Sequence, residues 1–374
     1  MRRTFRATLA AGVLAAGLGM LSGAPSPAGA AASSLGVYVG PGYVAQHDAF
    51  ANWLPAPVPY ASDALDHRFD WSYILSPWVL DSWAPWVRAV PGRRLVLSVP
   101  MLPASASGQL AAGAAGSFDG YFRTLAQNMV NRGLGHSVLR LGWEANGNWF
   151  PWAAAPDTTS WKAFYRRIVT TMRSVPGAAF AFDWNAASSA AGTNLTLDAF
   201  YPGDDVVDII GLDAYDLKWG DSTSTPDQRW NFTLNQFNGL VTHRNFAVAH
   251  GKPMSFPEWG LYAKGDINGG GGDNPYYIDR MADWFASNNV AYQSYFNWNW
   301  GGGDLNSFPN AKARYQARFG VATTSTTVAP ATTTTVKPTT TTTAPVTTTT
   351  TVKPTTTTST TKPKVCFSNR RSCR

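Results

Sequence analysis

Residues 137–144 read Ser-Val-Leu-Arg-Leu-Gly-Trp-Glu, a short apolar run that ends in a glutamate. Its length and aliphatic content are typical of a buried β-strand. After a loop rich in Gly, Asn and Trp, residues 160–174 place apolar side chains at helical spacing, with Ser160 as the expected N-cap. A strand, a loop and an amphipathic helix in this order predict one unit of a parallel sheet with a crossover helix.

The same alternation recurs along residues 33–320. We predict eight strands, at residues 36–39, 71–75, 94–99, 137–143, 179–184, 207–212, 254–258 and 292–298. The clearest helices are predicted at residues 118–132, 160–174, 228–248 and 275–288, the last with Asn274 as its N-cap. Eight strand-helix units in one domain favour a (β/α)₈ TIM barrel, an α/β fold with a closed parallel sheet.

The sequence predicts neither a cofactor nor a metal. No Gly-rich phosphate-binding loop opens a predicted helix, which argues against a nucleotide cofactor. Five histidines are scattered without metal-ligand spacing, at His47, His67, His136, His243 and His250. The only two cysteines, Cys366 and Cys373, lie beyond the predicted barrel, so its core is expected to fold without a disulfide.

Charge is divided unevenly along the chain. The net charge is +7, but residues 1–32 and 321–374 contain basic residues and no acidic ones. Residues 33–320 hold 20 basic and 23 acidic residues, a formal charge of about −3. A nucleic-acid partner is therefore not expected, because a phosphate backbone requires a concentrated positive surface. All 16 Trp lie in this central part, which suits both core packing and a cleft for ligands with flat apolar faces.

The N-terminal residues 1–32 have the pattern of a secretory signal. Arg2, Arg3 and Arg6 precede an apolar run over 9–21, and Ala28-Gly29-Ala30 supplies the small residues of a cleavage site. We therefore expect a secreted, extracellular protein. The apolar run is too short to span a membrane and no second one follows, so no membrane span is predicted.

The C-terminal part changes composition. Residues 321–363 are rich in Thr, Pro, Ala and Val and repeat Val-Lys-Pro-Thr-Thr-Thr-Thr at 336 and 352. Such a segment cannot bury a core and is predicted to be a disordered linker. Residues 364–374 form a short tail whose two cysteines can close a small disulfide loop.

Two glutamates follow predicted strands. Glu144 ends the fourth strand and Glu258 ends the seventh, and aromatic residues and glycines flank both. In a (β/α)₈ barrel the carboxyl ends of the strands form the mouth, where the chemistry occurs. Glycoside hydrolysis requires two carboxyl groups, one to protonate the leaving oxygen and one to attack or to activate water. A loop-side salt bridge would explain one such glutamate, but the pair favours catalysis.

Further residues at the strand ends are candidates for the same site. Arg140, on the fourth strand, is expected to point into the barrel, either to hold Glu258 ionised or to form an ordinary buried ion pair. Tyr215, at the end of the sixth strand, can donate a hydrogen bond to the nucleophile. Four further side chains are expected to line the cleft or to stack on sugar rings, although a lone strand-end Trp is as often packing: Trp143, Trp184, Asn185 and Trp298.

Three segments carry a family resemblance: residues 140–152, 200–215 and 252–260. They resemble glycoside hydrolase family 26, which contains the β-mannanases and belongs to a clan of retaining (β/α)₈ hydrolases. The resemblance covers most of residues 34–320. It implies that Glu144 is the acid/base and Glu258 the nucleophile. It also implies substrate-site roles for the tyrosine near the nucleophile, the aromatic five residues past the acid and the platform at the eighth strand, which are Tyr215, Trp149 and Trp298.

The resemblance implies a secreted, retaining endo-glycosidase that acts on a β-linked polysaccharide, and we expect it to be a monomer. The family usually has His immediately before the acid/base, where this chain has Trp143. Indole offers one donor and no acceptor, so sugar recognition at the cleavage point must differ. β-Mannan is the first candidate, followed by mixed-linkage β-glucan and β-1,3-xylan. The alternatives are a glycan-binding barrel without catalysis and an adhesive surface protein.

Overall fold

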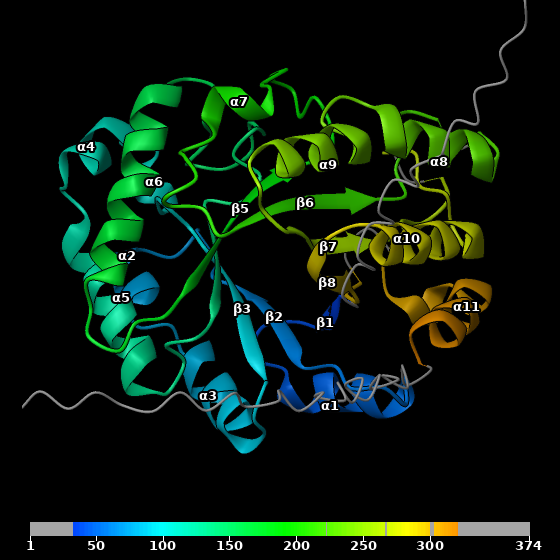
Figure 1. Ribbon diagram of the computed structural model, residues 1–374, viewed down its shortest axis with the longest axis horizontal. Coiled ribbons are helices and arrows are strands. Elements are labelled where there is room, and N and C mark those ends of the chain that lie inside the picture. The colour runs from blue at the N-terminus through cyan, green and yellow to red at the C-terminus, as the bar shows by residue number, and fades with distance from the viewer. Residues whose placement is uncertain (1–32, 222, 266–267, 300–302, 321–374) are drawn as a thin grey trace, which may run out of the picture. The chain divides into compact units, whose positions relative to one another are not determined.

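A computed structural model gives the fold of the chain, and it describes residues 33–320 except 222, 266–267 and 300–302. These residues belong to one compact unit, in which parallel strands close into a barrel in sequence order (Figure 1). The strands are β1 (Ser34–Tyr38), β2 (Tyr60–Ala64), β3 (Arg94–Val99), β4 (Val138–Leu141), β5 (Ala181–Ala187), β6 (Ile209–Tyr215), β7 (Met254–Gly260) and β8 (Val290–Phe296). The predicted (β/α)₈ barrel is confirmed.

Helices follow the strands and lie around the barrel (Figure 1). They are α1 (Val44–Trp53), α2 (Trp71–Leu75), α3 (Val79–Ala89), α4 (Leu110–Ala115), α5 (Asp119–Asn131), α6 (Thr158–Arg173), α7 (Leu197–Phe200), α8 (Pro226–Asn235), α9 (Leu240–Ala249), α10 (Pro275–Ser287) and α11 (Pro309–Phe319), with short 3₁₀ turns η1 (Ala104–Ala106) and η2 (Leu305–Ser307). No helix in the described ranges is long and apolar enough to cross a membrane.

The strand pairing closes through β1, which pairs with both β2 and β8. Two irregularities interrupt the ladders near the carboxyl ends of the strands. The register shifts between Gly211 and Ala214 in the β6–β7 pair, and between Phe256 and Trp259 in the β7–β8 pair. Bulges of this kind redirect side chains next to functional sites. Both flank the strand that carries Glu258.

The barrel has an apolar outer layer and a polar interior. Aliphatic and aromatic side chains such as Leu139 and Leu141 are buried in the large core cluster. The intervening Arg140 contacts residues of β3, β6 and β7, so it points inward across the barrel. Since successive side chains of a strand alternate between faces, one strand supplies both the core and the polar interior.

Two of the predicted elements are wrong. Residues 71–75 form helix α2 and not a strand, because Asp70 accepts a hydrogen bond from the Ser72 N–H at 2.9 Å and caps the helix. The second strand is β2, whose Tyr-Ala-Ser-Asp-Ala sequence carries no apolar alternation. The helix predicted over 228–248 is two helices, α8 and α9, separated by a turn in which Asn238 has φ +52°.

Of the two predicted helix N-caps, one is confirmed and one is wrong. Asn274 caps α10 as predicted, accepting from the Tyr277 N–H at 3.3 Å. The cap of α6 is Asp157 and not Ser160, which donates its own N–H to Asp157 at 2.9 Å. The predicted signal (1–32), linker (321–363) and tail (364–374) lie outside the described residues.

Candidate active site

A sharp turn places Glu144 at the end of β4. Gly142 has φ +57° and Glu144 has φ +51°, a left-handed conformation that costs a side-chain-bearing residue about 1–3 kcal/mol. A Cβ on Gly142 would lie 2.5 Å from the Met101 sulfur, so only glycine fits there. The Glu144 N–H donates to Asn185 Oδ1 at 3.2 Å and anchors the turn. Strain held by surrounding contacts at a carboxylic acid is a feature of functional sites.

Both carboxylate oxygens of Glu258 accept hydrogen bonds. Arg140 Nη1 donates to Oε1 at 2.7 Å, and the Tyr215 hydroxyl donates to Oε2 at 3.0 Å. The Glu258 side chain is 18% exposed, so it is held from below and open on one side. A cation and a phenol thus fix the orientation of this carboxylate.

Arg140 lies beneath the site and connects it to a second acid. Its guanidinium is 2% exposed and bonds both oxygens of Asp213, at 2.9 and 2.7 Å. Asn185 adds a bond to Asp213 at 3.0 Å. Burial acts to lower the pKa of Arg140, but Asp213 and Glu258 outweigh it and raise that pKa above its ordinary range. The cation therefore stays charged and fixes both acids.

Replacing Arg140 with methionine is expected to lower the free energy of unfolding by about 3–5 kcal/mol, because the carboxyl groups of Asp213 and Glu258 lose their buried cationic partner. Chemical denaturation of the full chain measures the loss. Arg166→Met is the matched control, since Arg166 pairs with Asp205 at the surface, with side chains 44% and 66% exposed. Such pairs are worth about 0–1 kcal/mol. A loss for Arg140→Met as small as the control would contradict a stabilising role for the buried Arg140–Asp213 pair.

Glu144 has the opposite environment to Glu258. Burial and the nearby charge of Glu258 raise the pKa of Glu144 to about 7, against the opposing effects of Arg140 and Trp149. The indole N–H of Trp149 donates to Glu144 Oε2 at 3.0 Å. No cation pairs with the Glu144 carboxyl within the described ranges. Two carboxyl groups whose environments differ in this way suit an acid and a nucleophile.

The two glutamates face one pocket of about 520 Å³. They are also the only two glutamates in the 374 residues of the chain. The loops after β4, β5, β6 and β7 supply the other walls: Trp143, Trp149, Phe150, Ala187, Ser188, Ser189, Asp213, Tyr215, Leu217, Trp219, Gln236, Tyr262 and Asn268. No Lys, Arg or His lines the pocket among the described residues, so its walls are aromatic, neutral or acidic.

Several predicted residues reach this pocket. Trp143, Trp149 and Tyr215 line it together with the glutamates. Trp143 is only 7% exposed, because its ring packs against Phe150 and Trp152 at centroid distances of 4.9 and 4.6 Å. Little of the Trp143 ring is therefore available to a ligand.

Three of the residues expected at the substrate site do not line the pocket: Arg140, Trp184 and Asn185. Arg140 and Asn185 are buried; Arg140 points into the barrel and bonds Glu258, as its place on the fourth strand led us to expect. Trp184 is fully buried and packs against Phe200, at a centroid distance of 4.6 Å, on the outer side of the sheet. It points outward because it alternates with the inward Asn185.

Trp298 lies beside another hollow. It lines a cavity of about 470 Å³ together with residues of α1 and η2, and not the pocket of the two glutamates. Its ring meets the edges of Tyr38 and Tyr43, at centroid distances of 6.2 and 5.7 Å. Contact with a sugar in the glutamate pocket is therefore not supported for this residue.

The sequence reasoning missed the residues that come from long loops. Trp219 is 53% exposed, follows β6 by four residues and lines the pocket. Leu217, Gln236, Tyr262 and Asn268 reach it from the loops after β6 and β7. Only Trp219 carried a usable signal, as a Trp shortly after a strand end in a Lys-Trp-Gly turn.

Comparison with known proteins agrees with this geometry. A family model described as glycosyl hydrolase family 26 matches residues 124–251. The resemblance to family 26 is confirmed. The family 26 match contains Glu144 and Tyr215 and ends shortly before Glu258.

Two curated relatives are similar in sequence to this chain. Endoglucanase H of Acetivibrio thermocellus is 27% identical over 225 residues, which are 57% of this chain and 23% of that protein. The mannan endo-1,4-beta-mannosidase of Bifidobacterium adolescentis is 29% identical over 168 residues, which are 44% of this chain and 16% of that protein. The matches thus span less than a quarter of these relatives.

Solved structures share the family 26 fold. A modular endo-beta-1,4-mannanase from Cellulomonas fimi matches with a TM-score of 0.56 and 19% identity, over 77% of this chain and 70% of that one. The catalytic domain of a GH26 endo-beta-1,4-mannanase from Bacillus sp. JAMB-750 matches with a TM-score of 0.56 and 18% identity, over 77% and 86%. At these identities the likeness establishes the fold alone.

Proposed function

We propose that this protein is a secreted, retaining endo-glycoside hydrolase that cleaves a β-linked polysaccharide, with β-mannan as the first candidate. One observation carries the proposal. The only two glutamates of the chain face one aromatic pocket, one bonded to a cation and a phenol, the other with a pKa raised to about 7. The division matches the two carboxyl roles of glycoside hydrolysis.

The proposed reaction is a double displacement. Glu258 attacks the anomeric carbon while protonated Glu144 gives its proton to the glycosidic oxygen, so the departing sugar leaves as an alcohol. Glu144, now ionised, takes a proton from water, whose oxygen attacks the same carbon. The bond to Glu258 then breaks and its electron pair returns to the carboxylate. Two inversions at one carbon give net retention.

The surrounding residues have supporting roles in this scheme. Arg140 and Tyr215 donate to the two oxygens of Glu258 and fix their direction. Asn185 and the strained turn hold Glu144 over the pocket. Trp149 bonds Glu144 and presents its exposed ring to a sugar face, which suits the flat apolar side of a pyranose.

The lining supports a neutral polysaccharide. Lys, Arg and His are absent from the described walls of the pocket, so it offers no cation to the carboxylates of an acidic polysaccharide. The name of the Bifidobacterium relative favours mannan for the family 26 segment. The name of the Acetivibrio relative makes a β-glucan the second candidate.

The test is reducing-sugar release by the full chain from mannan, galactomannan, mixed-linkage β-glucan, β-1,3-xylan and cellulose. Release from mannan with chain-shortening products would support an endo-mannanase. Release from a glucan instead would change the proposed substrate from mannan to a β-glucan and would still support glycoside hydrolysis. Binding without release from any of the five would replace hydrolysis by the glycan-binding alternative.

The pH profile tests the role of Glu144. Because Glu144 must be protonated to act as an acid and its pKa is raised to about 7, kcat/KM is expected to fall as the pH rises through about 7. Trp149 donates to the ionised carboxylate, which lowers that pKa. Trp149→Phe is therefore expected to move the basic limb to higher pH. Trp284→Phe, on α10, is the control, and a limb that stays in place in Trp149→Phe would contradict the assignment.

A further inference from the structure

A second hollow adjoins the pocket of the two glutamates. It has a volume of about 320 Å³ and is bordered by Asn148 and the loop over residues 189–192. Trp149, Ser189 and Trp219 line both hollows. The cleft therefore continues past Trp149, between the loops that follow β4, β5 and β6.

Trp219 is available to a ligand at this junction. Its side chain is 53% exposed, and no aromatic ring of the described residues packs against it. Trp149, at the same junction, is 46% exposed. Two exposed indoles beside one cleft offer flat apolar surface at a small cost in side-chain entropy, because each has only two rotatable bonds.

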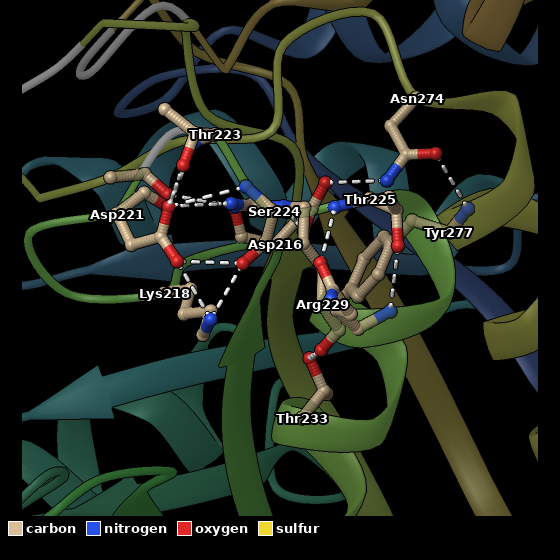
Figure 2. A network of polar contacts seen from close by, with 12 residues as sticks. Asp216, Lys218, Asp221, Thr223, Ser224, Thr225, Arg229, Thr233, Asn274 and Tyr277 are labelled. Atoms are coloured by element: carbon tan, nitrogen blue, oxygen red, sulfur yellow. Dashed lines mark hydrogen bonds and ion pairs between the residues drawn. The ribbon is translucent and has the colours of Figure 1, made fainter.

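Polar contacts hold the loop after β6 that carries Trp219, and Figure 2 shows those around Asp216, Lys218 and Arg229. The Arg229 guanidinium is 3% exposed and donates to Asp216 Oδ1 at 2.8 Å. It also donates to the Gly269 carbonyl at 2.8 Å, which ties the loop after β6 to the loop after β7. Lys218, which precedes Trp219 in the chain, bonds Asp221 Oδ2 through its Nζ at 2.7 Å. The loop that carries Trp219 is thus ordered before a ligand binds, which reduces the conformational entropy lost on binding.

The proposed reaction suggests which part of the substrate this hollow holds. Glu144 delivers its proton to the oxygen that leaves with the departing sugar. Trp149 bonds Glu144 directly and borders the hollow, so the hollow begins next to the proposed proton donor. A sugar further along the departing part of the chain would reach Trp219.

We infer that Trp219, together with Trp149, forms a binding site for the sugar units on the departing side of the cleaved bond. This inference rests on the proposed function and deepens it. A polysaccharide that occupies this site places the part of its chain that leaves after cleavage against Trp219 and Trp149. The site also holds a sugar acceptor, whose hydroxyl can replace water: its oxygen bonds the anomeric carbon, the bond to Glu258 breaks, and Glu144 takes the hydroxyl proton.

The first test measures binding apart from catalysis. In the full chain carrying Glu258→Gln, adding Trp219→Ala is expected to raise the Kd for β-1,4-linked mannohexaose about tenfold in calorimetry. Trp219→Phe, which keeps a ring, is expected to recover part of the affinity. Trp284→Ala is the matched control, since Trp284 is half-buried on the last turn of α10, at the opposite end of the barrel from the strand carboxyl ends. Equal affinities with and without Trp219, or equal losses in Trp219→Ala and Trp284→Ala, would overturn the inference.

The second test separates the inference from the proposed function. In the active chain, Trp219→Ala is expected to lower the ratio of kcat/KM for mannohexaose to that for an aryl β-mannoside about tenfold, mainly through KM, and to reduce transfer to added mannobiose. An unchanged ratio in an active enzyme would overturn the inference and leave hydrolysis standing. No hydrolysis by the parent chain, with hexaose binding weakened by Trp219→Ala, would overturn the function and support the site.

Discussion

Replacing Glu258 with alanine is expected to lower kcat on the polysaccharide by about 10⁵-fold or more, as loss of the nucleophile does in other hydrolases that form covalent intermediates. The variant has no group to attack the anomeric carbon. Arg140 keeps its bonds to Asp213, so the fold beneath the site is retained. Asp198→Ala, at an exposed carboxyl on α7, is the control and is expected to match the parent chain.

Azide makes this prediction specific to a nucleophile. In Glu258→Ala the space of the missing carboxyl opens on the face opposite the leaving group, and azide can attack there. With an activated aryl β-glycoside the expected product is the α-glycosyl azide, identified by NMR. A residual rate above about a tenth of the parent, or formation of a β-azide, would contradict the nucleophile assignment.

Replacing Glu144 with glutamine is expected to lower kcat/KM on the polysaccharide by about 10²- to 10⁴-fold, the usual contribution of general acid-base catalysis. A sugar alkoxide leaves poorly without a proton. An acidic phenol leaves without one, so the first step on an aryl glycoside should be much less affected. The basic limb near pH 7 should also disappear, since it reports the pKa of Glu144.

The comparison of leaving groups decides the role of Glu144. Rates for the parent chain and for Glu144→Gln on mannan and on aryl β-mannosides of graded phenol acidity measure it. A steep dependence on phenol acidity in the variant alone is expected. Equal losses on all substrates, or a basic limb that persists, would mean that Glu144 is not the proton donor.

The barrel strands could be predicted where local pattern and tertiary role agree. β3 reads Arg-Leu-Val-Leu-Ser-Val, and the predicted bounds are those observed. β2 reads Tyr-Ala-Ser-Asp-Ala, because small and polar residues fill the narrow interior of the barrel there. This sequence lacks the apolar run that predicts a strand. The Trp-Ser-Tyr-Ile-Leu of α2 looked more like a strand, but the cap at Asp70 turns it into a helix.

Some residues of the site could likewise be predicted from the sequence and others could not. Glu144 and Glu258 could be identified because each follows a strand pattern and the strands of a parallel barrel end at one mouth. The bond between Tyr215 and Glu258 was expected from position and is present in the structure. The side of the sheet on which the Trp184 side chain lies could not be predicted from its place at a strand end. It depends on the register of the strand, which turns Asn185 toward the barrel axis and Trp184 away from it.

The sequence by itself determined the alternation of strands and helices, the two carboxyl groups and their places at strand ends, since these depend on local periodicity and chain order. Only the tertiary structure decided that Asp213 shares Arg140 with Glu258, and that Trp219 and Trp149 border one cleft. These arrangements join residues far apart in the chain, and charge, burial and distance arise only when the barrel closes. The difference between the two glutamates follows from that closure, because one receives the buried cation and the other does not.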